Sequence, residues 1–200
     1  MASQAKAIIG LYQRHAADFD RQRGRSLFEK SWLDRFLNTI PAGGAILDLG
    51  CGMAEPIARY IIECGYAVTG VDSSPNMIAL CAARFPEQSW VIADMRQISL
   101  DRQVGGILAW DSFFHLKPDD QRLMFPVFAA HAGAGAMLMF TSGPRFGESI
   151  GTFEGEPLYH GSLDPDEYRS LLAANGFAVV AHLAEDRSCG YHTIWLAQKD

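Results

Sequence analysis

Short apolar runs alternate with longer amphipathic stretches along most of the chain. Short runs rich in Val, Ile and Leu are typical of strands, whereas apolar residues that recur every three or four positions are typical of helices. The pattern predicts strands at 45–49, 66–72, 89–93, 104–110, 134–142, 176–183 and 191–197. It predicts helices at 53–65, 75–85, 118–131 and 164–175. Strands that alternate with helices indicate an α/β fold, a doubly wound and mostly parallel sheet with helices on both faces.

The boundaries of several elements have clear local signals. Asp164 is a predicted N-cap with Pro165 at the first helical position, and Glu167 is spaced to complete a capping box. Pro126 should kink or interrupt the helix at 118–131, because proline lacks the backbone N–H that a helix interior needs. The last two predicted strands are joined by a short polar connection, which indicates an antiparallel hairpin.

Two segments fall outside the alternating pattern. Residues 1–40 are predicted to be helical and to form a lid over the site, with residues 41–200 as the main domain; the polar stretch 18–25 should be mobile. Ordinary packing on the side of the domain is the alternative for this lid. Residues 143–161 are predicted to be a long loop that roofs the site or, alternatively, a flexible surface loop.

Composition narrows the class of protein. The 200 residues suit one domain, and a net charge of −6 with a hydrophobic content of 48% argues against a sequence-independent nucleic-acid surface. No run is long enough to span a membrane, and the apolar stretch near the N-terminus is too short for a signal peptide. The four cysteines show neither metal-ligand spacing nor disulfide density. We therefore expect a cytoplasmic protein without a nucleic-acid or membrane partner.

The most informative segment begins at the first predicted strand. That strand leads into Gly50, Cys51 and Gly52, where bare backbone lets a ligand approach closely. The second strand ends at Asp72, and the separation from Gly50 is close to the roughly 20 residues expected for a ribose-binding acid. The alternative is that Asp72 is a helix N-cap, since Ser73-Ser74-Pro75 begins the next helix. The pattern predicts a site for an adenosine-containing cofactor at the carboxyl ends of the strands.

The charges around the glycines indicate which cofactor is bound. A dinucleotide fingerprint would need glycine at position 55, where the chain has Glu55. Asp48 and Glu55 are poor neighbours for phosphate but good neighbours for an ammonium group. A cofactor with adenosine at one end and an amino acid at the other, S-adenosylmethionine (SAM), therefore fits better than NAD. An NAD-dependent oxidoreductase is the less favoured alternative.

Three motifs carry a family resemblance: D-L-G-C-G at 48–52, V-D-S-S at 71–74 and A-D-M-R at 93–96. In this order and spacing they resemble the class I SAM-dependent methyltransferase family, from Ala45 to the C-terminus. The resemblance implies a seven-stranded sheet in the order 3-2-1-4-5-7-6 with the last strand antiparallel. It implies SAM as donor, S-adenosylhomocysteine (SAH) as product and no metal. One departure is Ala54, where the family usually has glycine.

The cofactor-binding residues follow from the motifs and the resemblance. In the family an acid such as Asp94 takes the adenine amino group, and the N–H of the next residue, Met95, meets a ring nitrogen. A solvated turn is the alternative for Asp94, and Arg96 is interpreted as a partner for a nearby carboxylate. Trp110 should lie beside the methionine part of the cofactor. The predicted cofactor-binding set is Asp48, Gly50, Cys51, Gly52, Asp72, Ser73, Asp94, Met95 and Trp110.

Candidate catalytic residues follow the fourth strand. Asp111, Ser112 and His115 should face the acceptor, because carboxyl ends of central strands point to the site. His115 is the first candidate general base and His160 the second; the alternative for His115 is a histidine bonded to backbone under a loop. The predicted catalytic residues are His115, His160 and Asp111. The predicted acceptor or lid residues are Tyr12, Trp32, Ser112 and Tyr159. The remaining histidines, interpreted as structural or surface, are His15, His131, His182 and His192.

The function that follows is transfer of a methyl group to O, N or S of a small molecule. The fourth strand lacks the N/D-P-P-Y/F motif of nucleic-acid amino-methylating enzymes, since Trp110-Asp111-Ser112-Phe113 stands there. We expect a small-molecule acceptor, no metal, and a monomer or homodimer. The alternative is a non-catalytic SAM-binding sensor or partner module.

Overall fold

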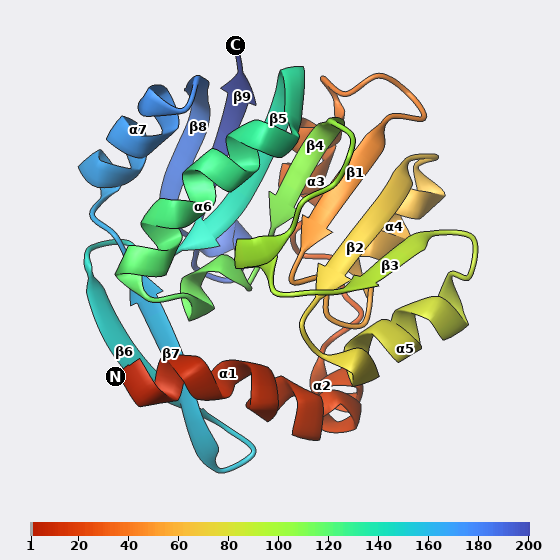
Figure 1. Cartoon of the computed structure of the whole chain (residues 1–200), viewed down its shortest axis with the longest axis vertical. Helices are drawn as coiled ribbons and strands as arrows, with labels where there is room; N and C mark the ends of the chain where they lie inside the picture. Colours follow the sequence, from red (N-terminus) through yellow and green to blue (C-terminus); the bar gives the residue numbers. More distant parts are fainter. Residues whose placement is uncertain (1) are drawn as a thin grey trace.

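The computed structural model of the chain describes residues 2–200, so Met1 of the predicted N-terminal lid lies outside the described residues. Its centre is a seven-stranded sheet in the order β3-β2-β1-β4-β5-β9-β8 (Figure 1). The first five strands are parallel, and β9 is antiparallel to both of its neighbours. Numbered within this sheet alone, the order is 3-2-1-4-5-7-6, which confirms the prediction. The bounds are β1 Ala45–Leu49, β2 Ala67–Asp72, β3 Ser89–Ile92, β4 Val104–Ala109, β5 Ala132–Ser142, β8 Phe177–Asp186 and β9 His192–Lys199.

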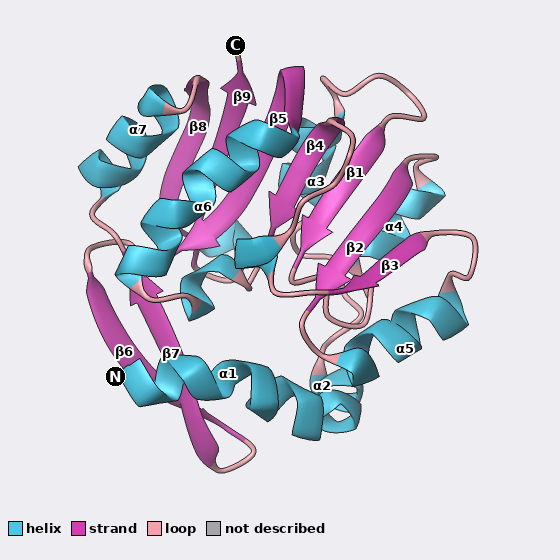
Figure 2. Cartoon of the chain, viewed as in Figure 1, coloured by secondary structure: helices cyan, strands magenta, loops and turns pink. Residues whose placement is uncertain are grey.

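Helices cover both faces of the sheet (Figure 2). The α-helices are α1 Ala2–Arg14, α2 Ala16–Gln22, α3 Lys30–Leu37, α4 Ile57–Glu63, α5 Pro75–Arg84, α6 Pro118–His131 and α7 Pro165–Ala174. Three 3-10 helices are η1 Met95–Gln97, η2 Phe113–His115 and η3 Arg187–Cys189. α3, α4 and α5 pack on one face of the sheet, and α6 and α7 pack on the other.

The strand sequences explain these two cores. In β1, Ile46 packs with α3 and α4, whereas Leu47 and Leu49 pack with the opposite layer. Successive side chains of a strand point to opposite faces, so a central parallel strand must be apolar on both. The continuous apolar runs of the sequence therefore become the buried middle of the sheet, and its polar chemistry is left to the strand ends.

Three local predictions were wrong in detail. The helix predicted at 53–65 begins only at Ile57, because the preceding residues belong to the glycine turn. α6 is a single helix that continues through Pro126. The capping box does not form: Asp164 accepts a hydrogen bond from the Asp166 N–H (2.9 Å), while Glu167 binds Arg122 on α6 (2.6 Å).

The segment 143–161, predicted to be a loop, contains most of an antiparallel hairpin. Its strands are β6 Gly147–Phe153 and β7 Glu156–Ser162. Glu154 and Gly155 form a two-residue turn with φ of 50° and 76°, the positive values that suit the twist of a tight hairpin. The hairpin lies beyond the carboxyl ends of the strands, beside α1 (Figure 1).

The N-terminal helices lie across the carboxyl edge of the sheet (Figure 1). At one end of α1, the Gln13 side-chain oxygen accepts a hydrogen bond from the Ser74 hydroxyl (2.7 Å), at the start of α5. At the other end, Ile8 and Leu11 pack against Tyr159 of the hairpin. α1 therefore connects the β6–β7 hairpin to the start of α5.

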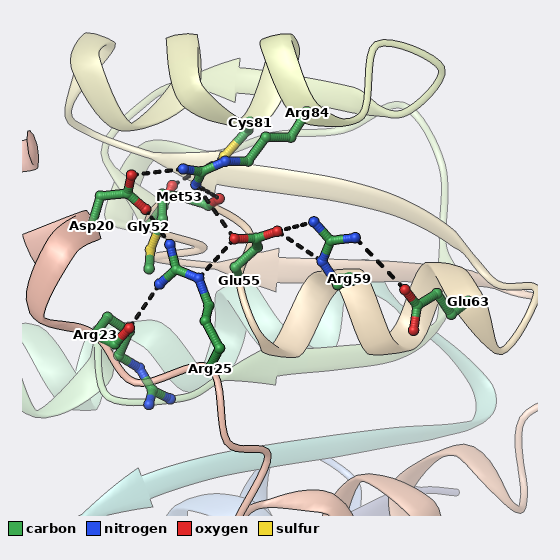
Figure 3. Close-up of polar contacts among 10 residues, drawn as sticks. All are labelled: Asp20, Arg23, Arg25, Gly52, Met53, Glu55, Arg59, Glu63, Cys81 and Arg84. Atoms are coloured by element: carbon green, nitrogen blue, oxygen red, sulfur yellow. Dashed lines mark hydrogen bonds and ion pairs between the residues drawn. The ribbon is translucent and has the colours of Figure 1, made fainter.

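The polar stretch 18–25, predicted to be mobile, is instead helical as far as Gln22 and is held by ion pairs (Figure 3). Asp20 binds Arg84 of α5 (2.7 Å) and Arg25 (2.6 Å). These ion pairs add to the apolar contacts of Phe19, which packs against Tyr12 and Phe153.

Within residues 2–200, every helix is too short or too polar to span a bilayer.

Candidate functional site

A cavity of about 520 Å³ lies at the carboxyl edge of the sheet. Its floor is the glycine turn after β1 with the ends of β2 and β4, and α1, α2 and β7 contribute the opposite walls. All nine residues predicted to bind the cofactor line it, as do the three predicted catalytic residues, Tyr12 and Ser112. The sheet therefore brings together residues that are far apart in the sequence.

The glycine turn needs its glycines for two different reasons. Gly50 has a φ of 75°, and a Cβ there would lie 2.2 Å from the Ser112 Cβ. The Ser112 hydroxyl in turn donates to the Leu49 carbonyl (2.6 Å), so this close packing is fixed. Gly52 has a φ of 54°, and a Cβ there would make an ordinary contact with the Phe19 ring (3.7 Å), so only the backbone conformation favours glycine there. Ala54 also has a positive φ, 68°, which a side chain adopts at a cost.

Asp72 links the glycine turn to the start of α5. Its carboxylate accepts hydrogen bonds from the N–H groups of Gly52 (3.0 Å) and Ser74 (2.8 Å). Burial raises the pKa of Asp72 to about 6, and these backbone bonds oppose the rise. The N-cap of α5 is Ser74, whose hydroxyl accepts from the Met77 N–H (3.3 Å). A carboxylate has about four acceptor positions, so Asp72 can still accept hydroxyl donors from the cavity.

Asp48 is a buried carboxylate at the end of β1 that lines the cavity. Burial raises its pKa to about 7, and the charge of Asp72 adds to this rise. Nearby, the Trp110 indole N–H is buried without a hydrogen-bond partner among the described residues. Buried polar groups are normally satisfied, so both features suit a ligand that brings its own polar atoms.

Glu55 does not have the role that its sequence position suggested. Its carboxylate is bound by Arg59 of α4 and by Arg25 Nε at 2.9 Å, with Arg84 at 4.0 Å (Figure 3). Three guanidinium groups already surround this acid. We therefore assign Glu55 to the attachment of the N-terminal segment and not to a ligand ammonium.

Asp94 at the end of β3 is paired with its neighbour Arg96. The Arg96 Nε lies 2.9 Å and 3.1 Å from the two carboxylate oxygens, and these bonds hold the pKa of Asp94 below its ordinary value. Arg96 also binds Asp120 on α6 (2.8 Å). This confirms Arg96 as a carboxylate partner. Asp94 still lines the cavity beside Met95, so its adenine role remains a prediction.

His115 has both ring nitrogens engaged. Nδ1 lies 2.8 Å from the Tyr159 carbonyl, which can only accept, so Nδ1 carries the proton. Nε2 then accepts a hydrogen bond from the Tyr12 hydroxyl at 3.0 Å. Burial lowers the pKa of His115 to about 4, so the ring is neutral near pH 7. The histidine is thus bonded to backbone and also faces the cavity through Tyr12.

His160 lies next to His115, whereas the predicted site residues Trp32 and Tyr159 lie outside the cavity lining. Its ring centre is 5.1 Å from that of His115, and burial lowers its pKa. Trp32 is outside the cavity lining: its indole N–H donates to Asp186 (2.8 Å) in the core that packs α3 on the sheet. The Tyr159 side chain is buried against α1, so this residue serves the site only through its carbonyl.

His192, at the start of β9, lines the cavity although the sequence interpretation placed it elsewhere. Its Nε2 lies 2.9 Å from an Asp111 oxygen, and its ring stacks on Trp110 with centres 5.4 Å apart. The sequence did contain a signal for this position. Because β9 is antiparallel to β5, β9 begins at the edge of the sheet where β5 ends, which is the edge that carries the cavity. Combining this topology with a histidine at the first position of the strand would have found it.

Possible metal ligands lie apart from the cavity. Among the described residues, the atoms of His15, Asp18 and Glu154 lie within 4.8 Å of one another, and none of these residues lines the cavity. His15 is bonded to Glu156 (2.7 Å). The expectation of metal-free chemistry stays a prediction.

Fold and site together define a class. A doubly wound sheet, a glycine turn after β1, an acid at the end of β2 and a cavity at the carboxyl edge are the features of an α/β protein that binds a nucleotide-type cofactor.

Comparison with known proteins narrows the class. Residues 46–133 match the model of a family described as a methyltransferase domain. YqeM of Bacillus subtilis (strain 168), named as a methyltransferase, is 30% identical over 112 residues, which are 54% of this chain and 44% of that protein. The chain thus spans less than half the length of this curated relative.

Solved structures share the fold over nearly the whole chain. Magnesium protoporphyrin IX methyltransferase from Synechocystis PCC 6803 with bound SAM has a TM-score of 0.74 at 16% identity, covering 98% of this chain and 97% of that chain. The 1,6-didemethyltoxoflavin-N1-methyltransferase of Burkholderia thailandensis has a TM-score of 0.74 at 19% identity, covering 99% and 88%. The chain therefore shares the fold of these methyltransferases, and residues 46–133 are similar to a methyltransferase domain.

Proposed function

We propose that the chain is an enzyme that transfers the methyl group of SAM to O, N or S of a small-molecule acceptor. One observation carries the proposal: a single cavity joins the glycine turn and Asp72 at one end to the Tyr12–His115 hydrogen bond at the other. The first end suits an adenosine-type cofactor, and the second end offers a proton acceptor. The two chemistries that methyl transfer needs are therefore in one cavity.

The residues present fit SAM. Gly52 lines the cavity, and a Cβ there would meet only the Phe19 ring, at 3.7 Å. Asp72 can take the ribose hydroxyls, and Asp48 can take the ammonium group. Asp94 and Met95 are placed for the adenine, and Cys51, Ser73 and Trp110 complete the lining. The unpartnered Trp110 N–H and the Asp48 carboxylate are the polar groups that such a ligand would satisfy.

When bound, SAM supplies an electrophilic methyl group, whose bonding electrons stay on sulfur while a lone pair of the acceptor forms the new bond. The chain's own part is alignment, exclusion of water and removal of a proton where the acceptor carries one. Tyr12 can take that proton as it passes its own to Nε2 of His115, which is neutral and positioned to accept it. His160, beside them, is the second candidate base.

The acceptor is proposed to be small because a cavity of about 520 Å³ has the size of a small-molecule site. Residues of α1 and α2, which belong to the proposed 1–40 lid, form part of its lining. The similar structures include one named for magnesium protoporphyrin IX and one with bound 1,6-didemethyltoxoflavin, both small molecules. We further propose a cytoplasmic, metal-free monomer or homodimer without a nucleic-acid or membrane partner.

Titration of the purified chain with SAM, SAH and NAD(H) tests the proposal. We expect SAM and SAH to bind and NAD(H) not to bind. Asp72→Ala should weaken SAM binding by about tenfold or more, because it removes hydrogen bonds to a charged group. NAD(H) binding without SAM binding would refute the cofactor, and SAM binding without transfer to a broad metabolite panel would favour a sensor.

A further inference from the structure

Asp111 has an unusual backbone conformation directly after β4. Its φ is 48°, in the left-handed region that residues with side chains seldom adopt, and such positions often mark functional sites. The surrounding structure holds it there, since the Asp111 N–H donates to the Thr141 hydroxyl at the end of β5 (2.9 Å). The result is that the carboxylate is directed into the cavity wall and not along the strand.

His192 fixes the orientation of this carboxylate. Its Nε2 lies 2.9 Å and 3.1 Å from the two Asp111 oxygens, and its Nδ1 lies 2.7 Å from the Cys189 carbonyl. Both ring nitrogens face groups that can only accept, so the ring is best satisfied with a proton on each. Burial disfavours that charge, but the hydrogen bond and the charge of Asp111 outweigh it and raise the pKa of His192 above its ordinary value.

The His192 ring is also held by packing. It stacks on Trp110 with centres 5.4 Å apart, and the tilted ring of Phe28 lies beside it with centres 5.5 Å apart. A histidine with a proton on each nitrogen cannot serve as a general base. Its geometry suits a positioning residue that acts through Asp111.

Asp111 differs from the other acids of the cavity. The others are Glu55, Asp94 and Asp120, each paired with arginine, and Asp48 and Asp72, which flank the glycine turn. The Asp111 side chain is 36% exposed and keeps free acceptor positions. After burial, its charge is the next cause that raises the pKa of Tyr12, so it lies within electrostatic reach of the Tyr12–His115 pair.

The surroundings of Asp111 select for a group that donates hydrogen bonds and tolerates positive charge. A carboxylate only accepts, and the rings of Tyr12, Phe19, Trp110 and Phe114 also line the cavity. Aromatic faces beside a carboxylate favour cations. When a neutral amine takes a methyl group from a sulfonium, the positive charge passes from sulfur to nitrogen, where a fixed carboxylate stabilises it.

We propose that Asp111, positioned by His192 and Thr141, binds the amine nitrogen of the acceptor, so that the chain is an N-methyltransferase. This inference rests on the proposed methyl transfer and narrows O, N or S to nitrogen. In the reaction, the nitrogen lone pair forms the C–N bond and the C–S electron pair remains on the neutral thioether. A proton then leaves the methylated ammonium for solvent.

Three probes of similar shape test the preference: phenethylamine, 2-phenylethanol and 3-phenylpropionate. Their affinities are measured by calorimetry on the full chain saturated with SAH. We expect phenethylamine to bind at least about tenfold more tightly than the other two, and Asp111→Asn to abolish that preference. SAH affinity is measured separately for every variant, and the probes are compared at saturating SAH, so that a change at the cofactor end is not mistaken for a change in amine preference.

Variants of His192 separate positioning from packing. His192→Phe keeps the stacked ring and loses both N–H groups, so it should behave like Asp111→Asn and raise the KM for the amine more than it lowers kcat. His192→Gln keeps a donor toward Asp111 and should retain part of the preference. The matched control is His182→Phe, whose ring stacks on Trp195 (3.6 Å) outside the cavity lining and should change nothing.

Each other outcome overturns a defined claim. Equal affinity for the three probes, no amine binding, or an amine preference that survives Asp111→Asn would refute the amine site while SAH still binds. Failure of the unmodified chain to bind SAH would refute the proposed function itself. A preference abolished by Asp111→Asn but unchanged in His192→Phe would refute the positioning role.

Discussion

At the residue scale, the floor of the cavity holds acids that destabilise the empty protein. Asp48 and Asp72 have pKa values raised to about 7 and about 6, since burial penalises their charged forms. Folding alone gives no reason to keep two such carboxylates close together. Binding of a cationic ligand with hydroxyl groups would be a reason to keep them. The loss of stability caused by these two carboxylates is therefore consistent with a site adapted to binding at the expense of stability.

This cost can be measured with Asp48→Asn. A carboxyl whose folded pKa is raised destabilises the protein above that pKa, and the penalty is relieved as pH falls and the native state takes up a proton. The variant should therefore increase the free energy of unfolding of the cofactor-free protein at pH 8 by about 2–4 kcal/mol. The gain should shrink between pH 7 and pH 4.

Urea unfolding of both proteins across this pH range is the measurement. SAM affinity should fall in the variant, in the direction opposite to stability. A gain that is the same at pH 8 and pH 4 would show that the charge of Asp48 is not its cause.

At the element scale, attachment of the N-terminal helices depends on charge as much as on apolar packing. Asp20 and Arg25 of the N-terminal segment meet Glu55, Arg59 and Arg84 of the α/β domain in one connected group (Figure 3). Glu55 is its centre, with a side chain only 8% exposed, so its pairs are less screened by water than surface ion pairs.

Glu55→Gln tests this centre, and Glu63, at the end of α4, provides a matched control. The substitution leaves partly buried guanidinium groups without their anion and should destabilise the protein by about 1–3 kcal/mol. Glu63→Gln removes an acid that lies 3.7 Å from Arg59 but is 62% exposed, so it should change stability by less than about 0.5 kcal/mol.

Denaturant unfolding at low salt compares the two variants. Added salt should reduce the difference between them. Equal effects of the two substitutions would argue against Glu55 as the centre of the attachment.

The elements also show what sequence patterns can and cannot predict. Most helix bounds and the glycine turn depend on short-range patterns, whereas the sheet order followed from the family resemblance; these predictions were confirmed. The β6–β7 hairpin, the ion pairs of Glu55 and the place of His192 depend on contacts between segments far apart in the chain. The sequence interpretation assigned Glu55 to a ligand and placed His192 away from the site. It was wrong for both because their partners, Arg25 and Asp111, are distant in the sequence.

At the scale of the whole molecule, the proposed donor and acceptor ends belong to different parts of the chain. The strand ends of the sheet hold the glycine turn and its acids, whereas α1, α2 and the hairpin supply the opposite walls. The hydrogen bond between the Tyr12 hydroxyl of α1 and His115, after β4, connects these two parts. Binding at one end should therefore change the order of segments at the other.

Hydrogen exchange with and without SAH tests the proposed lid. SAH at 100 times its Kd should raise the free energy of unfolding by about 2.7 kcal/mol and slow amide exchange in α1 and α2. Local exchange in α7, on the far side of the sheet, provides the comparison. Uniform slowing in all three helices would mean that the N-terminal segment moves with the domain as one body.

The β6–β7 hairpin has a consequence for how new enzymes could arise from this scaffold. It is an excursion between β5 and α7 whose two strands pair only with each other and not with the seven-stranded sheet. Its residues can therefore be exchanged or lengthened without altering any strand pairing in the domain. Grafting a different hairpin at this point is a direct way to change the acceptor while the cofactor end is inherited intact.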